Sequence, residues 1–253
     1  MTDRITIAIL AKDKAHTLPL YLWCIEQLDW PKDRLLLYIR TNNNNDTTAS
    51  ILKAWVEHVG ARYAAVHFDD SDVATPVQQY GQHEWSSERF RVLAEIRQDS
   101  MTWAHAHNSH YFVADCDNFV RSETLRAIEH TGLPIVAPLL HSQTAYSNYH
   151  AAIDTNGYLA ECDLYYQLLR QEIRGLVDVP VVHCTYLVRH EAIPALSYSD
   201  GSHRYEYVIF SDSARRAGIP QYLDTRRSYG RITFAESDDQ LAAEPWRHEL
   251  PPM

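Results

Sequence analysis

The first 70 residues alternate between short apolar runs rich in β-branched residues and segments with apolar residues at helical spacing. Three runs predict buried strands, and two segments between them predict helices. The strands are expected at residues 5–10, 35–39 and 63–68, and the helices at residues 17–28 and 49–59. Strands that alternate with helices form a parallel sheet with right-handed crossovers. The sequence therefore predicts an α/β fold with a mostly parallel central sheet flanked by helices.

Two loops follow the predicted strands at residues 12–16 and 41–46. Sheets of this kind bind ligands beyond the carboxyl ends of their strands, where the strand order reverses. The second loop is polar, and Asp46 or Thr47 is expected to cap the helix that follows. We therefore expect both loops to border a ligand site.

The pattern changes after the third strand. Residues 69–85 are polar and irregular, and residues 86–107 predict a long helix. Val92, Ile96 and Trp103 mark its apolar stripe, and Arg97 falls within that stripe.

The later elements are less regular than the first ones. Strands are predicted at residues 111–114, 135–138 and 179–182, and a helix is predicted around residues 205–217. Residues 235–253 are acidic, contain proline and are expected to be loosely ordered.

Two acids end the apolar run at residues 111–114. Asp115 and Asp117 are two positions apart, and such residues of an extended chain point to one side. Two carboxylates that close repel each other unless a positive charge lies between them. A hard divalent cation such as Mn²⁺ or Mg²⁺ fits oxygen ligands of this kind. The alternative is that Asp117 and Asn118 only begin the next turn.

Other charged clusters offer weaker candidates. His105, His107 and His110 lack the i, i+4 spacing of a helical zinc site, so surface or hydrogen-bonded histidines are expected. The basic pairs at residues 215–216 and 226–227 predict solvated faces, although one of them could hold phosphate.

Composition narrows the classes of function. The chain has 253 residues and a formal net charge of -10, so we expect one domain and no general binding to nucleic acid. The chain has 16 tyrosines and 6 tryptophans. Packing and surface exposure account for most of them, but such rings also line sugar and nucleotide sites.

Cysteine spacing and hydropathy indicate where in the cell the protein is expected. Cys24, Cys116, Cys162 and Cys184 include no CxxC pair, so reduced thiols in a cytoplasmic protein are expected. The N-terminal apolar run is too short for a signal peptide, and no run is long enough to predict a membrane span.

Seven segments together resemble the collagen β(1-O)-galactosyltransferases, which are glycosyltransferase family 25-like enzymes of the GT-A nucleotide-sugar class. They occur in the family's order over about residues 5–230. The segments are AILAKDKAHTLPLYLWCIEQLDWPKDR, NNNNDTTASILKAWV, RFRVLAEIRQ, YFVADCDN, APLLHSQTAYSNYH, VPVVHCTYLV, and YEYVIF with SYG. The resemblance implies a GT-A fold in a single domain. Its nucleotide-sugar half would span residues 1–120, its acceptor half residues 121–235, and its tail residues 236–253.

The resemblance also implies an activity. It implies a metal-dependent, inverting transfer of galactose or glucose from a UDP-sugar to a hydroxyl of a glycan, a lipid-linked saccharide or a protein. Asp115 and Asp117 match the family's DxD motif, which holds Mn²⁺ (or Mg²⁺). The residues that match positions around the donor are Ala11, Lys12, Asp13, His16, Asn43, Asp46, Arg97, Asp115 and Cys116.

The general base is expected in the YEYVIF segment. Where the family has FDD, Glu206 matches one acid and Tyr207 replaces the other. A carboxylate near the acceptor hydroxyl can remove its proton, so Glu206 is the first candidate base and Asp212 the second.

Two other functions remain open at this point. A nucleotidyltransferase also sets paired acids and a metal against phosphates, but the loop at residues 11–15 lacks the glycines of a phosphate loop. A catalytically inactive module that binds a UDP-sugar is the other alternative, and Tyr207 favours it.

Overall fold

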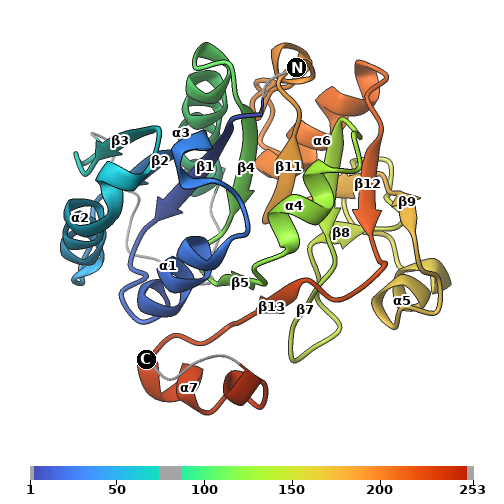
Figure 1. The fold of residues 1–253 in the computed structure, drawn as a ribbon. Helices are drawn as coiled ribbons and strands as arrows, with labels where there is room; N and C mark the ends of the chain where they lie inside the picture. The colour runs from blue at the N-terminus through green and yellow to red at the C-terminus, as the bar shows by residue number, and fades with distance from the viewer. Residues whose placement is uncertain (1–2, 74–86, 250–253) are drawn as a thin grey trace.

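An eight-stranded sheet forms the centre of the protein (Figure 1). The computed structural model describes residues 3–73 and 87–249. Most of the segment predicted to be irregular after the third strand lies outside these ranges. The strands are β1 (Ile5–Ala11), β2 (Leu35–Thr41), β3 (Ala65–Asp69), β4 (His110–Ala114), β6 (Ile135–Pro138), β9 (Leu176–Asp178), β11 (Thr185–Val188) and β12 (Gln221–Asp224).

The sheet is mostly parallel, as the sequence predicts. Its order is β3-β2-β1-β4-β11-β6-β12-β9, and the first four strands in this order are parallel to one another. Strand β11 is antiparallel to both β4 and β6. Because the chain moves outward from β1 to β3 and then returns to the other side of β1 with β4, the order reverses between β1 and β4. This reversal is where sheets of this type bind ligands.

Both faces of the sheet are covered by helices. The helices are α1 (Leu18–Gln27), α2 (Thr48–Val59), α3 (Ser87–Ala106), α4 (Thr124–Glu129), α5 (Asp163–Leu169), α6 (Glu206–Arg216) and α7 (Asp238–Ala242). Short 3-10 turns occur at Lys32–Arg34, Gly60–Arg62, Ile193–Ala195 and Arg247–Glu249. Helices α1, α2, α4 and α7 contribute to one apolar core, and α3, α5 and α6 contribute to the other.

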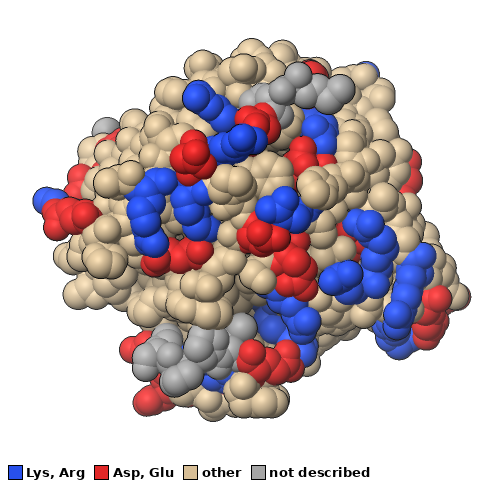
Figure 2. Space-filling model, viewed as in Figure 1, with Lys and Arg blue, Asp and Glu red and all other residues tan. Residues whose placement is uncertain are grey.

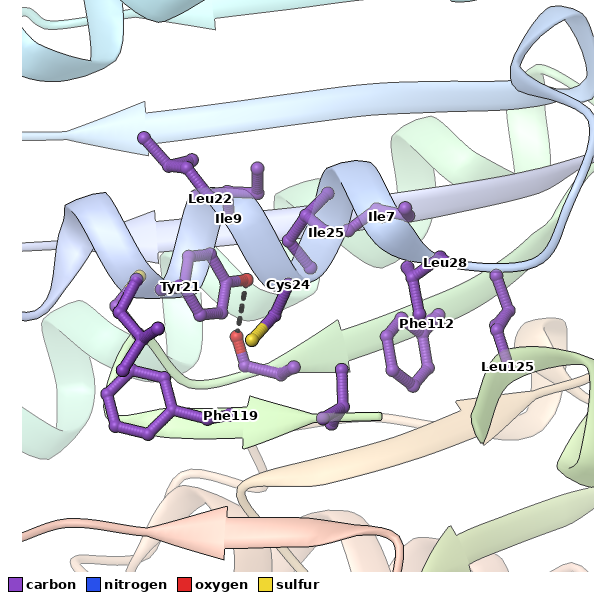
Figure 3. Packing of buried hydrophobic residues seen from close by; sticks show 14 of the residues in the cluster. Ile7, Ile9, Tyr21, Leu22, Cys24, Ile25, Leu28, Phe112, Phe119 and Leu125 are labelled. Atoms are coloured by element: carbon purple, nitrogen blue, oxygen red, sulfur yellow. Dashed lines mark hydrogen bonds between the residues drawn. The ribbon is translucent and has the colours of Figure 1, made fainter. Parts of the chain in front are cut away.

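Alternating residues of β4 face the two cores. Phe112 belongs to the core under α1, whereas Tyr111 and Val113 belong to the core under α3. Figure 3 shows α1 lying over this part of the sheet, where the hydroxyl of Tyr21 donates a hydrogen bond of 2.9 Å to the carbonyl of Ala114. This contact fixes the end of β4 immediately before the two acids.

Two smaller sheets extend the fold beyond β4. Strand β13 (Gly230–Ile232) pairs with β5 (Asn118–Val120) and β7 (Leu140–His141), and β8 (Tyr149–His150) pairs with β10 (Val181–Val182). A side chain at Gly230 would lie 2.2 Å from the carbonyl oxygen of Phe119, so only glycine fits there. The close approach brings the C-terminal segment against the chain that follows the acids.

Two predictions about single elements were wrong. The buried face of α3 passes through Phe90, Ala94, Arg97, Met101 and Ala104, whereas Val92, Ile96 and Trp103 are only half-buried. Of the residues predicted to form the stripe, Arg97 is therefore the only one that is buried. Of the strand predicted at residues 179–182, only Val181–Val182 form a strand, β10. Strand β9 ends at Asp178, and Pro180 lacks the N–H group that a continuous strand requires.

The tail was also predicted wrongly over its described part. Leu241 and Trp246 are buried in the core under α1, and Trp246 packs against Phe119 with 5.5 Å between ring centroids. Helix α7 begins with a side-chain cap from Ser237. In Figure 1, β13 and α7 cross the lower part of the fold. The acidic side chains of this packed segment are exposed at Glu236, Asp238, Asp239 and Glu249, whereas Glu244 is buried.

Within the described ranges, no helix is long and apolar enough to cross a membrane. On the face drawn in Figure 2, basic and acidic side chains are interspersed.

Candidate functional site

The loops after β1 and β4 meet where the strand order reverses. Lys14 from the first loop places its Nζ 2.8 Å from Oδ2 of Asp117, and both side chains are about three-quarters buried. Asp115–Asp117 form a tight turn, in which the N–H of Asn118 donates to the carbonyl of Asp115 at 2.8 Å. The two acids thus belong to a turn, and Asp117 contacts Lys14 of the neighbouring loop. Their place in a ligand crevice and in a metal site stays a prediction.

The two predicted loops are tied to each other. The N–H of Ala15 donates to Oδ2 of Asp46, and the N–H of Asn45 donates to Oδ1 of Asp13. Asp13 and Asn43 have φ angles of 52° and 43°, a left-handed conformation that these residue types tolerate. The asparagine-rich loop therefore builds a fixed rim beside Lys14.

Helix capping differs from the expectation in one detail. Thr47 occupies the N-cap of α2 but makes no side-chain cap, while Oδ1 of Asp46 accepts from the N–H of Thr48. The hydroxyl of Thr48 accepts from the N–H of Lys14 at 2.7 Å, so the start of α2 holds the backbone of the lysine.

Arg97 joins the turn to the C-terminal half of the chain. Its Nη2 lies 2.7 Å from Oδ1 of Asp115, and its Nε lies 3.5 Å from Oε1 of Glu206. Both Arg97 and Glu206 are 4% exposed. Among the described residues, Nε and Nη1 of Arg97 and Oε2 of Glu206 have no hydrogen-bond partner. Buried polar atoms without partners are costly, so this cluster has unused capacity to bind a polar ligand.

Burial dominates the electrostatics of the cluster. It raises the pKa of Glu206 to about 7, and the opposing charge of Arg97 only limits the rise. Burial, opposed by Arg97 and reinforced by Asp117, also raises the pKa of Asp115. For Lys14, burial acts to lower the pKa, but the carboxylate of Asp117 more than offsets it, and the pKa is raised.

The remaining residues predicted to surround the donor lie at the end of β1, in the loop that follows it and in the turn after β4. His16 contacts the carbonyl of Ala235 through Nε2 at 2.9 Å, and Lys12 pairs with Asp13 at the exposed rim. Ala11 is buried at the end of β1. The thiol of Cys116 contacts the carbonyl of Leu10 at 3.5 Å, and the residue belongs to the core under α1. Only the main chain of Cys116 therefore lies in the turn with the two acids.

Asp212 is in a different environment from the other candidates. Its carboxylate contacts Arg204 at 2.9 Å, Arg216 at 2.8 Å and Arg215 at 3.3 Å. It lines a shallow cavity of ≈ 370 Å³ together with Ser197 and Ser199. The structure therefore does not bring Asp212 together with Asp115, Arg97 and Glu206 in any recorded contact.

The predicted basic pairs and histidines have structural partners. Arg226 pairs with the buried Asp224 at 2.6 Å. His105 stacks on His190 with 4.5 Å between ring centroids, and His110 is buried and accepts from the N–H of His190. The three histidines therefore take part in packing and hydrogen bonding.

Sequence reasoning missed a group of residues behind the turn. The N–H of Asp115 donates to the carbonyl of Cys184 at 3.0 Å, and Cys184 has a φ angle of 62°. The neighbouring His183 packs between Tyr146 and Tyr207, with ring centroids 5.6 Å and 5.0 Å away. The available signal was the pair of family-like segments APLLHSQTAYSNYH and VPVVHCTYLV, which contain Tyr146, His183 and Cys184.

The chain supplies few ligands for a metal on its own. No group of three or more His, Cys, Asp or Glu side chains in the described ranges is arranged to hold an ion. The carboxylates of Asp115 and Asp117 are hard oxygen donors, which suit Mn²⁺ or Mg²⁺. The donor set fits such an ion when a ligand and water provide the other oxygens.

The chain is similar in sequence to proteins that are named as glycosyltransferases or as inactive members of a glycosyltransferase family. A family model described as "Glycosyltransferase family 25, N-terminal domain" matches residues 2–244. A bovine protein named "Probable inactive glycosyltransferase 25 family member 3" is 34% identical over 93% of this chain and 41% of its own. The human "Procollagen galactosyltransferase 2" is 33% identical over 95% of this chain and 40% of its own. The chain thus spans about two fifths of the length of these relatives.

Solved structures confirm the predicted GT-A fold. S. aureus TarS 1-349 in complex with UDP-GlcNAc matches with a TM-score of 0.59 at 11% identity, over 95% of this chain and 61% of that one. GalNAc-T7 with UDP, GalNAc and Mn²⁺ matches with a TM-score of 0.55 at 11% identity, over 90% and 43%. At this identity the likeness concerns the fold alone.

Proposed function

Because this chain belongs to glycosyltransferase family 25, we propose that it transfers a hexose from a UDP-sugar to an acceptor hydroxyl with inversion. Galactose or glucose is the proposed sugar. The observation that carries the proposal is the position of Asp115 and Asp117 at the reversal of strand order, each within 2.8 Å of a protein cation. Such a cluster of balanced charges suits a ligand that brings both phosphate and a cation.

Asp115 and Asp117 would hold Mn²⁺ or Mg²⁺. Each carboxylate has one oxygen on a protein cation, namely Oδ1 of Asp115 on Arg97 and Oδ2 of Asp117 on Lys14. No described residue contacts the other oxygen of either carboxylate, and this oxygen would bind the ion. When bound, the ion would act as a Lewis acid that neutralises charge on the diphosphate leaving group.

Two side chains of the protein would stabilise the same charge. Arg97 keeps unused N–H donors beside Asp115, and Lys14 is fixed through its backbone to Thr48. Preorganised cations lower the energy of a transition state in which negative charge develops on the leaving group. We therefore assign Lys14 and Arg97 to the diphosphate.

Glu206 is the proposed general base. Its carboxylate contacts Arg97, and Arg97 contacts Asp115. A single side chain therefore separates the carboxylate of Glu206 from the DxD turn. Its Oε2 is an acceptor without a partner among the described residues, and its pKa of about 7 suits proton removal near neutral pH. Inversion requires such a base because the acceptor hydroxyl attacks directly.

The proposed acceptor is a hydroxyl group of one of three classes of molecule. A hydroxyl of a glycan, a lipid-linked saccharide or a protein would each provide the nucleophile. The name of the human relative refers to procollagen, and the relatives are more than twice as long as this chain. We propose the reaction class for this chain, with a cytoplasmic setting, and not that particular acceptor.

A second candidate is a module that binds a UDP-sugar without turnover. It is favoured by Tyr207, which stands where the family has a second acid, and by relatives named inactive, such as the bovine one. Both candidates predict binding of UDP, and only the first predicts its release from a UDP-sugar.

The test is the product formed from UDP-galactose or UDP-glucose with Mn²⁺ and a panel of glycoside and hydroxylated peptide acceptors. Release of UDP with a glycosylated acceptor supports the transferase. Binding of UDP without release supports the inactive module. Release of pyrophosphate from a sugar phosphate and UTP would instead identify a nucleotidyltransferase.

A further inference from the structure

Two aromatic rings are left in solvent beside the acidic turn. Tyr146 and Phe234 are 40% and 41% exposed, whereas large apolar side chains on most of the described chain are buried. Their ring centroids are 5.4 Å apart at an interplanar angle of 70°. The two residues come from distant parts of the sequence, so the fold, and not local chain geometry, brings them together. We call this pair the aromatic platform.

The aromatic platform is attached to both acids of the turn. On one side, the N–H of Thr233, which precedes Phe234, donates to the carbonyl of Asp117 at 3.0 Å. On the other side, the hydroxyl of Tyr146 lies 3.4 Å from Sγ of Cys184, whose carbonyl accepts from the N–H of Asp115. The rings therefore border the position that the donor diphosphate would occupy.

Phe234 is held in place from the C-terminal side as well. The carbonyl of Ala235 contacts His16 at 2.9 Å, and the hydroxyl of Thr233 donates to the buried Glu244 at 2.6 Å. The ring of Phe234 is thus 41% exposed on a segment that is fixed on both sides. A rigid aromatic surface loses little conformational entropy when a ligand binds to it.

The surroundings of the aromatic platform select the chemistry of its ligand. The main chain before Phe234 contacts that of Asp117, whose carboxylate pairs with Lys14, and the ring of Tyr146 contacts that of His183. A pyranose has the matching form, with a face of C–H groups for the rings and hydroxyls for the polar rim. A second anion would be repelled by the nearby acids.

We propose that Tyr146 and Phe234 form a pyranose-binding subsite. The inference rests on the proposed function, because that function supplies the pyranose either as the donor hexose or as an acceptor saccharide. Both sources present the same C–H face, and the experiment distinguishes them.

The experiment compares the wild type with Tyr146→Ala, Phe234→Ala and the double variant in the presence of Mn²⁺. Calorimetry measures the Kd of UDP and of UDP-galactose, and saturation-transfer NMR measures binding of methyl β-D-galactopyranoside and methyl β-D-glucopyranoside. Trp23→Ala, which removes a ring that is 39% exposed on α1, is the matched control. Tyr146→Phe keeps the ring and is expected to retain binding.

A loss of about fivefold or more in affinity for UDP-galactose, with UDP unchanged, assigns the subsite to the donor hexose. A similar loss for a methyl glycoside alone assigns it to the acceptor. Equal loss for UDP and UDP-galactose, or no change with any probe, overturns the inference. If the wild type binds no UDP, the proposed function fails, and the glycoside measurements alone decide the subsite. If it binds no glycoside either, the subsite is refuted as well.

Discussion

The guanidinium of Arg97 lies 2.7 Å from the carboxylate of Asp115 while it is itself 4% exposed. A buried cation is stable only when it is paired, and Arg97 also has the buried Glu206 within 3.5 Å. The same side chain therefore supports the folded state and connects the DxD turn to the candidate base.

Arg97→Met should lower the free energy of unfolding at pH 8 by about 3 kcal/mol, because it leaves two acids of a buried cluster without their cation. Urea denaturation measures this. At pH 5.5, Glu206 is protonated in the variant and the loss should be smaller. Arg126→Met, which breaks the exposed pair with Asp29, should leave the transition nearly unchanged. Equal effects of the two substitutions would contradict the buried cluster.

Glu206→Gln should reduce kcat about 100-fold or more, as expected when a general base is removed. In the wild type, kcat/KM should rise with pH through about 7, because Glu206 must be deprotonated to accept a proton. That limb should be absent from the residual activity of the variant. If Asp212→Asn, and not Glu206→Gln, removes the limb, the second candidate is the base.

The free energy of unfolding should fall as the pH rises, whereas kcat/KM should increase. The folded-state pKa of Glu206 is about 7 and its ordinary value is 4.5, so the folded state binds more protons between these values. The contribution of Glu206 to stability is then fully present below about pH 4.5 and is lost as the pH rises through 7. Thermal denaturation of wild type and Glu206→Gln across this range measures it. A wild-type profile that the substitution leaves unchanged would refute the raised pKa.

Lys14→Met should increase the affinity of the nucleotide-free protein for Mn²⁺ several-fold, because it frees the Asp117 oxygen that Lys14 occupies. The same change should weaken binding of UDP, since one cation for the diphosphate is lost. Calorimetry gives both constants. Lys12→Met, at the exposed pair with Asp13, is the control and should change Mn²⁺ affinity little. Unchanged or weaker Mn²⁺ binding by Lys14→Met would show that the lysine does not compete with the ion.

Trp246→Ala should destabilise the protein by about 3–5 kcal/mol, the usual loss for removing a large buried ring. Trp246 is 4% exposed and packs on Phe119 of β5, immediately after the acidic turn. Trp23→Ala is again the matched control, because its ring is 39% exposed. Similar urea midpoints for the two variants would mean that the tail is not part of the core.

The helices and strands that the sequence predicted well are those whose pattern lies within their own residues. Strands β1, β2 and β4 are mostly apolar runs, and α1 and α2 have apolar residues at helical spacing, so each element can be predicted from its own residues. Asp115 and Asp117 were found because they follow such a run directly. The assignment of base and donor residues, and the division into halves, stays a prediction.

Other features depend on contacts between distant segments. Strand β11 inserts antiparallel between β4 and β6, and nothing within Thr185–Val188 indicates that position. The burial of the tail depends on Trp246 meeting Phe119, and the acidic residues around it obscured that contact. The role of His183 and Cys184 as neighbours of Asp115 likewise arises only when β11 pairs with β4.

The most direct test of the central claim is the binding of UDP to wild type and Asp117→Asn by titration calorimetry, with Mn²⁺ and with EDTA. If Asp115 and Asp117 hold an ion for the donor diphosphate, wild type binds UDP with Mn²⁺, loses about tenfold or more in affinity with EDTA, and Asp117→Asn behaves as wild type in EDTA. Equal affinity of both proteins for UDP, with and without Mn²⁺, would contradict the claim.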